Sequence, residues 1–176
     1  MIVHFKFAIL IPKTFPLEMA GPVMCAGVTM YSPLLNLGCK AGTKVAIVGL
    51  GGLGQMGIKI AKAMGATVSV FSTTPSKRSL ATNLNVDDFI VSTDSKQIKE
   101  NEGKFDIILN TISVYHDFYA FQRTLNRSGI QVILGLHAGL VAAMLTDNLT
   151  FGNSRIKFSG NIQYYNLLNI TIIIMI

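Results

Sequence analysis

The feature that most constrains the fold is a hydrophobic run that passes directly into a cluster of glycines. Residues 45–54 read VAIVGLGGLG, with three glycines in the spacing G-x-G-x-x-G, and residues 53–64 then carry apolar side chains at helical spacing. In that spacing the first glycine permits a tight turn, the second lets the backbone approach a pyrophosphate, and the third lets the helix pack on the strand. The start of the helix would offer free N–H groups to the phosphates. The segment predicts a strand, a phosphate-binding turn and a helix, with cofactor contacts from Gly49, Leu50, Gly51, Gly52, Leu53 and Gly54.

Two other interpretations of the glycine cluster stay open. A glycine-rich turn can simply connect a strand to a helix, and a methyltransferase can also carry a glycine-rich first loop. The methyltransferase interpretation expects an acidic residue at the end of the second strand.

The rest of the chain alternates short apolar runs with amphipathic stretches, the pattern of βαβ units. Half of the residues are hydrophobic and only 14% are charged, which suits strands covered on both faces. We therefore predict an α/β fold, a Rossmann-type doubly wound parallel sheet with helices on both faces. Gly65 and Gly129 are expected to take positive φ where helices end. The predicted strands are residues 45–48, 67–71, 88–91, 105–109 and 130–134, and the predicted helices are residues 53–64, 76–83, 95–101 and 117–125.

The sequence divides into three parts. Residues 1–40 are interpreted as a linker segment with a leading helix over residues 22–36, and residues 41–163 as the nucleotide-binding domain, with a further short strand near residues 156–159. Residues 164–176 read YYNLLNITIIIMI, an apolar tail shorter than the roughly 20 residues of a membrane-spanning helix. We interpret the tail as a core strand or the mark of a truncation, and expect no membrane partner.

Charge and cysteine content exclude several classes of protein. The formal net charge is +6, but the basic residues are scattered and the only adjacent pair is Lys77 and Arg78. Nucleic-acid binding needs clustered basic residues, so no nucleic-acid partner is expected. The two cysteines, Cys25 and Cys39, follow no signal peptide and form neither a disulfide framework nor a CxxC zinc site. A reducing, cytoplasmic location is expected.

The loop after the second predicted strand distinguishes between two dinucleotides. An acidic residue there would bind both ribose hydroxyls and select NAD, but residues 72–78 contain no Asp or Glu. Hydroxyls and a basic side chain would instead bind a 2′-phosphate, which predicts NADP with contacts from Ser72, Thr73 and Lys77. The alternative is an ordinary polar loop in which Ser76 caps the next helix and Lys77 and Arg78 are solvated.

Several stretches together resemble a known family, the zinc-dependent medium-chain alcohol dehydrogenases, and within it the cinnamyl-alcohol dehydrogenase group. They are MCAGVTMYSPL (residues 24–34), KVAIVGLGGLGQMGIKIAKAMGATV (44–68), FSTTPSK (71–77) and Gly135 at the end of the fifth strand. The first stretch is specific to that group, and the second is shared more widely among medium-chain reductases. The resemblance implies hydride transfer between NADP(H) and a zinc-polarised alcohol or aldehyde, and a homodimer through the sheet edge is one expectation.

The resemblance also implies roles for single residues. Cys25 would be the third ligand of the catalytic zinc, and Thr29 would lie beside the nicotinamide; without the resemblance, Cys25 is better interpreted as a small buried hydrophobic residue. The family's other zinc ligands, its proton relay and its four-cysteine zinc site have no counterpart in this sequence. His4, His116 and His137 lack metal-ligand spacing to Cys25 and are interpreted as surface or loop residues.

Two further loops fall at strand ends, where open α/β sheets bind ligands. Residues 111–114 follow the fourth predicted strand and Gly135 follows the fifth. The resemblance implies that Thr111 and Gly135 touch the ribose and the nicotinamide amide, and simple turns are the alternative. Because so much of the family's catalytic domain is missing, the sequence predicts the cofactor-binding part of an oxidoreductase, and a non-catalytic NADP-binding or interaction module remains the alternative.

Overall fold

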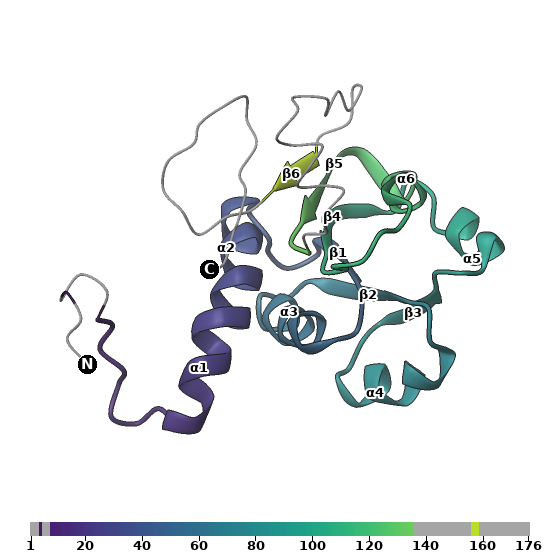
Figure 1. Ribbon diagram of the computed structural model, residues 1–176. Helices are drawn as coiled ribbons and strands as arrows, with labels where there is room; N and C mark the ends of the chain where they lie inside the picture. Colours follow the sequence, from purple (N-terminus) through teal and green to yellow (C-terminus); the bar gives the residue numbers. More distant parts are fainter. Residues whose placement is uncertain (1–3, 5–7, 136–155, 159–176) are drawn as a thin grey trace.

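The computed structural model describes residue 4, residues 8–135 and the backbone of residues 156–158. Within these ranges the strands form a six-stranded sheet in the order β3-β2-β1-β4-β5-β6, and every neighbouring pair is parallel (Figure 1). The strand order reverses between β1 and β4, so the predicted doubly wound sheet is confirmed. The strands are β1 (Lys44–Val48), β2 (Thr67–Ser72), β3 (Asp88–Val91), β4 (Phe105–Asn110), β5 (Leu125–Ile133) and β6 (Ile156–Phe158).

Helices cover both faces of the sheet. Val45 and Ile47 of β1 belong to a core shared with α2 (Val28–Asn36), α3 (Gly52–Ala63) and α4 (Arg78–Asn83). Ala46 and Val48 point to the other face, where α5 (Ser95–Glu100) and α6 (Phe118–Gln122) contribute to a second core. Lys44 at the start of β1 is exposed, but the four residues that follow it are all buried, so the strand is apolar at successive positions and not only at every second one.

The segment before the sheet is helical from Leu17 to Asn36, five residues earlier than the sequence predicts. A 3₁₀ turn (Leu17–Met19), α1 (Ala20–Pro22) and a π-helical turn (Val23–Gly27) lead into α2. Figure 1 shows this helix lying alongside α3. A Cβ placed on Gly57 of α3 would lie 2.2 Å from the Met30 methyl carbon, so the glycine leaves the space that the Met30 side chain fills. The leading helix thus shares the core of the sheet.

The region between β4 and β5 differs from the prediction. The helix predicted over residues 117–125 ends at Gln122, and β5 begins at Leu125, five residues before the predicted start. The register between β4 and β5 shifts because Leu125 pairs with Phe105 whereas Ile130 pairs with Ile107. The extra residues of β5 form an irregularity that an apolar pattern does not reveal.

The two glycines expected at helix ends behave differently. Gly65 has φ +83°, as predicted. Gly129 is not among the described residues with positive φ, so that prediction is wrong. A Cβ at Gly129 would instead lie 2.7 Å from the Phe105 carbonyl oxygen and 2.8 Å from a methyl carbon of Leu125. Close approach of two strands, and not a turn, requires glycine there.

Asp87, the residue before β3, connects that strand to β2 and α3. One carboxylate oxygen of Asp87 accepts a hydrogen bond of 2.6 Å from Val68 N–H in β2, and the carboxylate forms a salt bridge of 2.9 Å with Lys62 in α3. Burial would raise the pKa of this carboxyl, but the hydrogen bonds from Lys62 and Val68, together with the charge of Lys62, outweigh it. The pKa of Asp87 therefore lies below the ordinary value of 3.8.

The lowered pKa predicts how Asp87 contributes to stability. Because the folded-state pKa is depressed, its contribution is complete above pH 3.8 and is lost as the pH falls through the folded-state pKa. Asp87→Asn should lower the free energy of unfolding by about 1 kcal/mol at neutral pH, since the side chain is partly exposed. Urea unfolding should show this difference shrinking in acid below the ordinary pKa, and a difference that persists unchanged in strong acid would contradict the assignment.

Candidate functional site

The predicted phosphate-binding turn lies at the point where the strand order reverses. Gly49 follows β1 with φ +97°, and its N–H donates to the Phe71 carbonyl in β2 over 2.9 Å. A Cβ on Gly54 would lie 2.0 Å from the Gly49 carbonyl oxygen, so the first turn of α3 packs directly on the turn that precedes it. Two of the three motif glycines are thus required by the protein's own geometry.

The remaining glycines of the turn face open space. A Cβ on Gly51 or Gly52 would meet no described atom within 4 Å. The backbone of Gly51, at φ −101°, also suits any residue, so the protein's own geometry does not require glycine there. Gly51 is the N-cap of α3, no side chain caps the helix, and its first turn carries no acidic residue. The first N–H groups of a helix have no partner within it, so this end offers donors and positive potential to an anion.

The loop after β2 brings a lysine over the glycine turn. Lys77 ends the short 3₁₀ helix Pro75–Lys77, and its Nζ donates to the Leu50 carbonyl oxygen over 3.4 Å. Ser72 is buried and its Oγ accepts from Thr74 N–H, whereas Thr73 is exposed. No side chain caps the 3₁₀ helix or α4, so the expected Ser76 cap is wrong. Lys77 and Arg78 are exposed, as the polar-loop alternative expects.

Arg78 points away from this loop. Its guanidinium carbon lies 4.8 Å from the centre of the Phe89 ring, and its Nη2 donates to the Phe89 carbonyl oxygen over 3.4 Å. Of the adjacent basic pair, only Lys77 contacts the glycine turn in these interactions.

The loops after β4 and β5 meet at the same edge of the sheet. Both the N–H and the Oγ1 hydroxyl of Thr111 donate to the Val48 carbonyl oxygen, over 3.0 and 2.8 Å. A Cβ on Gly135 would lie 2.2 Å from the Ile112 carbonyl oxygen, so only glycine fits at this position after β5. The structure therefore brings the predicted residues Gly49, Thr111 and Gly135 together, and their contacts with a cofactor stay a prediction.

Sequence reasoning missed two residues beside this loop. Asn110, the last residue of β4, is fully buried, and its Nδ2 lies 2.7 Å from Nε2 of His116. His116 is half-buried, and its ring centre lies 4.2 Å from that of Phe118. A polar residue directly after the apolar run of residues 107–109, at the carboxyl end of the strand, is the signal that could have identified Asn110.

The predicted zinc ligand lies in the leading helix. Cys25 is exposed within the π-helical turn, so its interpretation as a small buried hydrophobic residue is wrong. Thr29 is buried and its Oγ1 donates to the Cys25 carbonyl oxygen over 2.8 Å. Within the described ranges, no three His, Cys, Asp or Glu side chains form a group that could hold a metal ion. His4 is exposed, and His137 lies outside the described residues.

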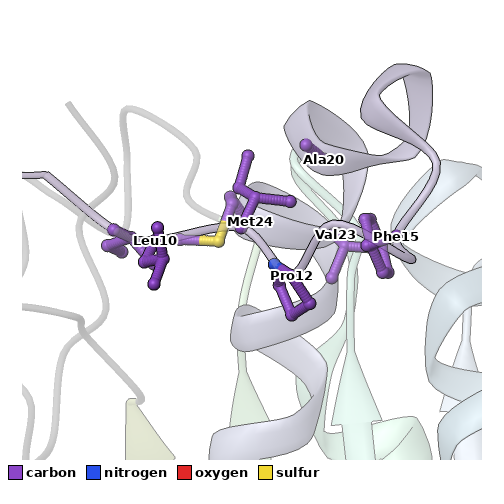
Figure 2. A pocket seen from close by; sticks show the side chains of 8 residues that line it. Leu10, Pro12, Phe15, Ala20, Val23 and Met24 are labelled. Carbon is purple, nitrogen blue, oxygen red and sulfur yellow. The ribbon is translucent and has the colours of Figure 1, made fainter.

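A small apolar pocket lies beside the leading helix (Figure 2). It has a volume of about 140 Å³, and its lining from the N-terminal arm includes Leu10, Pro12 and Phe15, facing Val23 and Met24 of the helix. Dinucleotide sites need placed hydrogen-bond donors, which apolar side chains do not provide. The pocket is therefore separate from the glycine turn in both place and chemistry.

No helix in the described part of the chain combines the length and the apolarity that crossing a bilayer demands.

Comparison with known proteins identifies the family. The family model described as "Zinc-binding dehydrogenase" matches residues 52–169. The chain belongs to this family. It is 44% identical over 137 residues to cinnamyl alcohol dehydrogenase 8 of Arabidopsis thaliana, a match that covers 77% of this chain and 38% of that protein. The resemblance to the cinnamyl-alcohol dehydrogenase group is thereby confirmed.

Solved structures agree with this assignment. A cinnamyl alcohol dehydrogenase from Sorghum bicolor superposes with a TM-score of 0.69 at 36% identity, covering 82% of this chain and 41% of that one. A cinnamyl alcohol dehydrogenase from Helicobacter pylori, solved in complex with NADP(H), gives a TM-score of 0.69 at 37% identity with the same coverage. This family member thus spans about two fifths of the length of the relatives it matches.

Proposed function

We propose that this chain is the NADP-binding part of an alcohol or aldehyde oxidoreductase. The observation that carries the proposal is the position of Lys77, whose Nζ contacts the glycine turn at Leu50 in a loop without acidic residues. A lysine there supplies the positive charge that a ribose 2′-phosphate needs. The Helicobacter pylori relative, solved with NADP(H), supports the same cofactor.

The residues of the turn fit the pyrophosphate of such a cofactor. Gly51 and Gly52 leave open space where a side chain would stand, and α3 begins there without a capping side chain. We propose that Gly49, Leu50, Gly51, Gly52, Leu53 and Gly54 bind the pyrophosphate, that Ser72, Thr73 and Lys77 bind the 2′-phosphate and its ribose, and that Thr111, Gly135 and Thr29 border the nicotinamide half. The bound cofactor would supply the hydride, and the chain would bind and orient it.

Zinc does not fit the described residues in the same way. Cys25 is exposed, and no group of three metal-ligating side chains occurs within the described ranges. A catalytic zinc needs three protein ligands, and the described residues alone do not supply them. Action on alcohols or aldehydes with a zinc ion is a proposal for the whole protein of this family, with Cys25 as one ligand.

Three further proposals concern the setting of the molecule. We propose a cytoplasmic location, because Cys39 is a buried free thiol, as a reducing compartment allows. We propose residues 1–40, 41–163 and 164–176 as junction, nucleotide-binding domain and tail. We also propose a homodimer. β6 is the last strand of the described sheet, and an edge strand can pair with a second copy of the chain.

The second candidate is an NADP-binding module without catalytic activity. It is favoured by the same lack of a metal-ligating group among the described residues. Cofactor binding without aldehyde reduction by the purified chain would support this candidate, and zinc-dependent oxidation of NADPH by an aldehyde would contradict it.

Lys77→Ala tests the cofactor assignment. We expect the dissociation constant for NADPH to rise by about three- to tenfold, because a charge-assisted contact to an exposed phosphate is lost, while the constant for NADH stays unchanged. Cofactor fluorescence measures both constants. Lys59→Ala removes the same charge from an exposed position on α3 and serves as the matched control.

Two results would contradict the proposal. Equal affinity of the wild-type chain for NADPH and NADH would exclude the 2′-phosphate contact. Failure to bind either cofactor would exclude a nucleotide-binding function for the isolated chain.

A further inference from the structure

The end of β4 and the loop that follows it contain a connected set of hydrogen bonds. Asn110 Oδ1 accepts from the Ile112 N–H over 3.1 Å, and Asn110 Nδ2 lies 2.7 Å from His116 Nε2. The other ring nitrogen, Nδ1, lies 2.8 Å from the Val114 carbonyl oxygen. An amide and an imidazole therefore connect two backbone atoms of residues 111–114.

Only one tautomer of His116 satisfies all three contacts. A backbone N–H can only donate, so Ile112 fixes Oδ1 of Asn110 as an acceptor and leaves Nδ2 as a donor toward the ring. Nε2 of His116 must then accept. The Val114 carbonyl can only accept, so Nδ1 carries the proton. The arrangement requires a neutral imidazole.

The loop held in this way borders the proposed cofactor site. Thr111 ties its first residue to β1 through the Val48 carbonyl, and Gly135 packs against its Ile112 carbonyl. These two contacts fix one side of the loop. The contacts of Asn110 and His116 fix the Ile112 N–H and the Val114 carbonyl, so the shape of residues 111–114 depends on the imidazole.

We propose that Asn110 and His116 are positioning residues for the cofactor, and that the neutral imidazole holds residues 111–114 in the conformation that binds NADP. This inference rests on the proposed function. Protonation of His116 places an N–H on Nε2 opposite the Asn110 amide, so two donors face each other and the bond is lost. The amide or the ring must then move, and the loop loses one of its supports.

The surroundings of the ring allow this change to be tested by pH. Phe118 and Phe121 of α6 face the imidazole, with ring centres 4.2 and 6.0 Å away, and the Asn110 amide faces it from β4. Its titratable neighbours in sequence are Tyr115, which is 86% exposed, and Asp117, whose carboxylate accepts from the Tyr119 N–H over 2.9 Å. Histidine side chains change charge between about pH 5 and 8.

The test measures NADP⁺ binding by calorimetry at pH 7.5 and 5.5 in the full chain and its variants. His116→Gln keeps an acceptor for Asn110 but does not titrate. Any change in its affinity between the two pH values therefore measures the effect of protonating the cofactor's own phosphate. Relative to this variant, wild-type affinity should fall about fivefold at the lower pH, the effect of one neutral hydrogen bond. His116→Leu should bind about fivefold more weakly at pH 7.5, and His116→Gln should recover most of that loss.

Asn110→Asp should reverse the pH dependence of NADP⁺ affinity. Its carboxylate would face the lone pair of neutral Nε2 at pH 7.5 but accept a hydrogen bond from the Nε2–H of the charged ring at pH 5.5. Relative to His116→Gln, its affinity should therefore rise about fivefold on acidification. Parallel pH profiles for the wild type, His116→Gln and Asn110→Asp would overturn the inference.

A measurement without cofactor separates this inference from the proposed function. The ¹⁵N shifts of the His116 ring should report the Nδ1–H tautomer at pH 7.5, and the Ile112 amide should lose about fivefold in exchange protection in His116→Leu but not in His116→Gln. The other tautomer, or unchanged protection, would overturn the loop-holding role. If the wild type binds no NADP⁺ at either pH, the proposed function fails and so does the claim about affinity, while the ring shifts still decide the tautomer.

Discussion

Gly54→Ala should lower the free energy of unfolding by about 3 kcal/mol, at the upper end of what overpacking costs. The new Cβ would lie 2.0 Å from the Gly49 carbonyl oxygen, which belongs to the backbone of a turn already fixed at φ +97°. Neither atom can move without displacing α3 from β1. Urea unfolding measures the loss, and the same variant should bind NADPH weakly because the turn no longer has its native shape.

The neighbouring glycines provide matched controls. Gly52→Ala adds a methyl group to open space in the first turn of α3, so it should leave stability unchanged or raise it by up to about 1 kcal/mol. Gly51→Ala should likewise leave the fold intact. Its affinity for NADPH should nevertheless fall at least tenfold, since this is the position where we expect the backbone to approach the pyrophosphate.

Gly54→Ala and Gly51→Ala thus separate two roles that a glycine motif combines, helix packing and cofactor binding. A Gly54→Ala chain as stable as the wild type would mean that α3 can shift on the sheet. A Gly51→Ala chain that binds NADPH like the wild type would remove the glycine turn from the proposed cofactor site.

The sequence predicts this turn well because the reasons for its glycines are local. Gly49 and Gly54 lie five residues apart and contact each other, so their spacing alone carries the steric requirement. The central strands were equally predictable, because strands buried on both faces are continuous apolar runs. The end of β2 and the loop to Lys77 follow from the same fold, which fixes where a residue can meet the ribose.

Other features depend on contacts between distant segments. Gly129 is needed because the Phe105 carbonyl comes close to it, and no property of its neighbours in sequence reveals that approach. The Asn110 and His116 pair requires the loop between them to fold back on β4. The π-helical turn at Cys25 sits within an unbroken helical segment, so helical periodicity alone does not distinguish it.

Phe71→Ala should cost about 3 to 5 kcal/mol of unfolding free energy, the range for removing a fully buried aromatic ring. The Phe71 side chain is 0% exposed and lies between two other rings, with centres 5.7 Å from Phe105 and 5.3 Å from Phe121. These edge-on contacts join β2 to β4 and α6. Phe71→Leu keeps most of the volume and should cost about 1.5 kcal/mol.

Phe71→Ala also tests whether the buried ring affects cofactor binding. The backbone of residue 71 accepts the hydrogen bond from Gly49 N–H, and alanine keeps that carbonyl. Saturating NADPH should therefore raise the urea midpoint of Phe71→Ala, provided that a folded fraction remains, because a ligand that binds only the folded state shifts the equilibrium by mass action. If Phe71→Leu, which stays folded, lost its cofactor affinity as well, the ring itself would hold the glycine turn in place, and the backbone bond would be insufficient to do so.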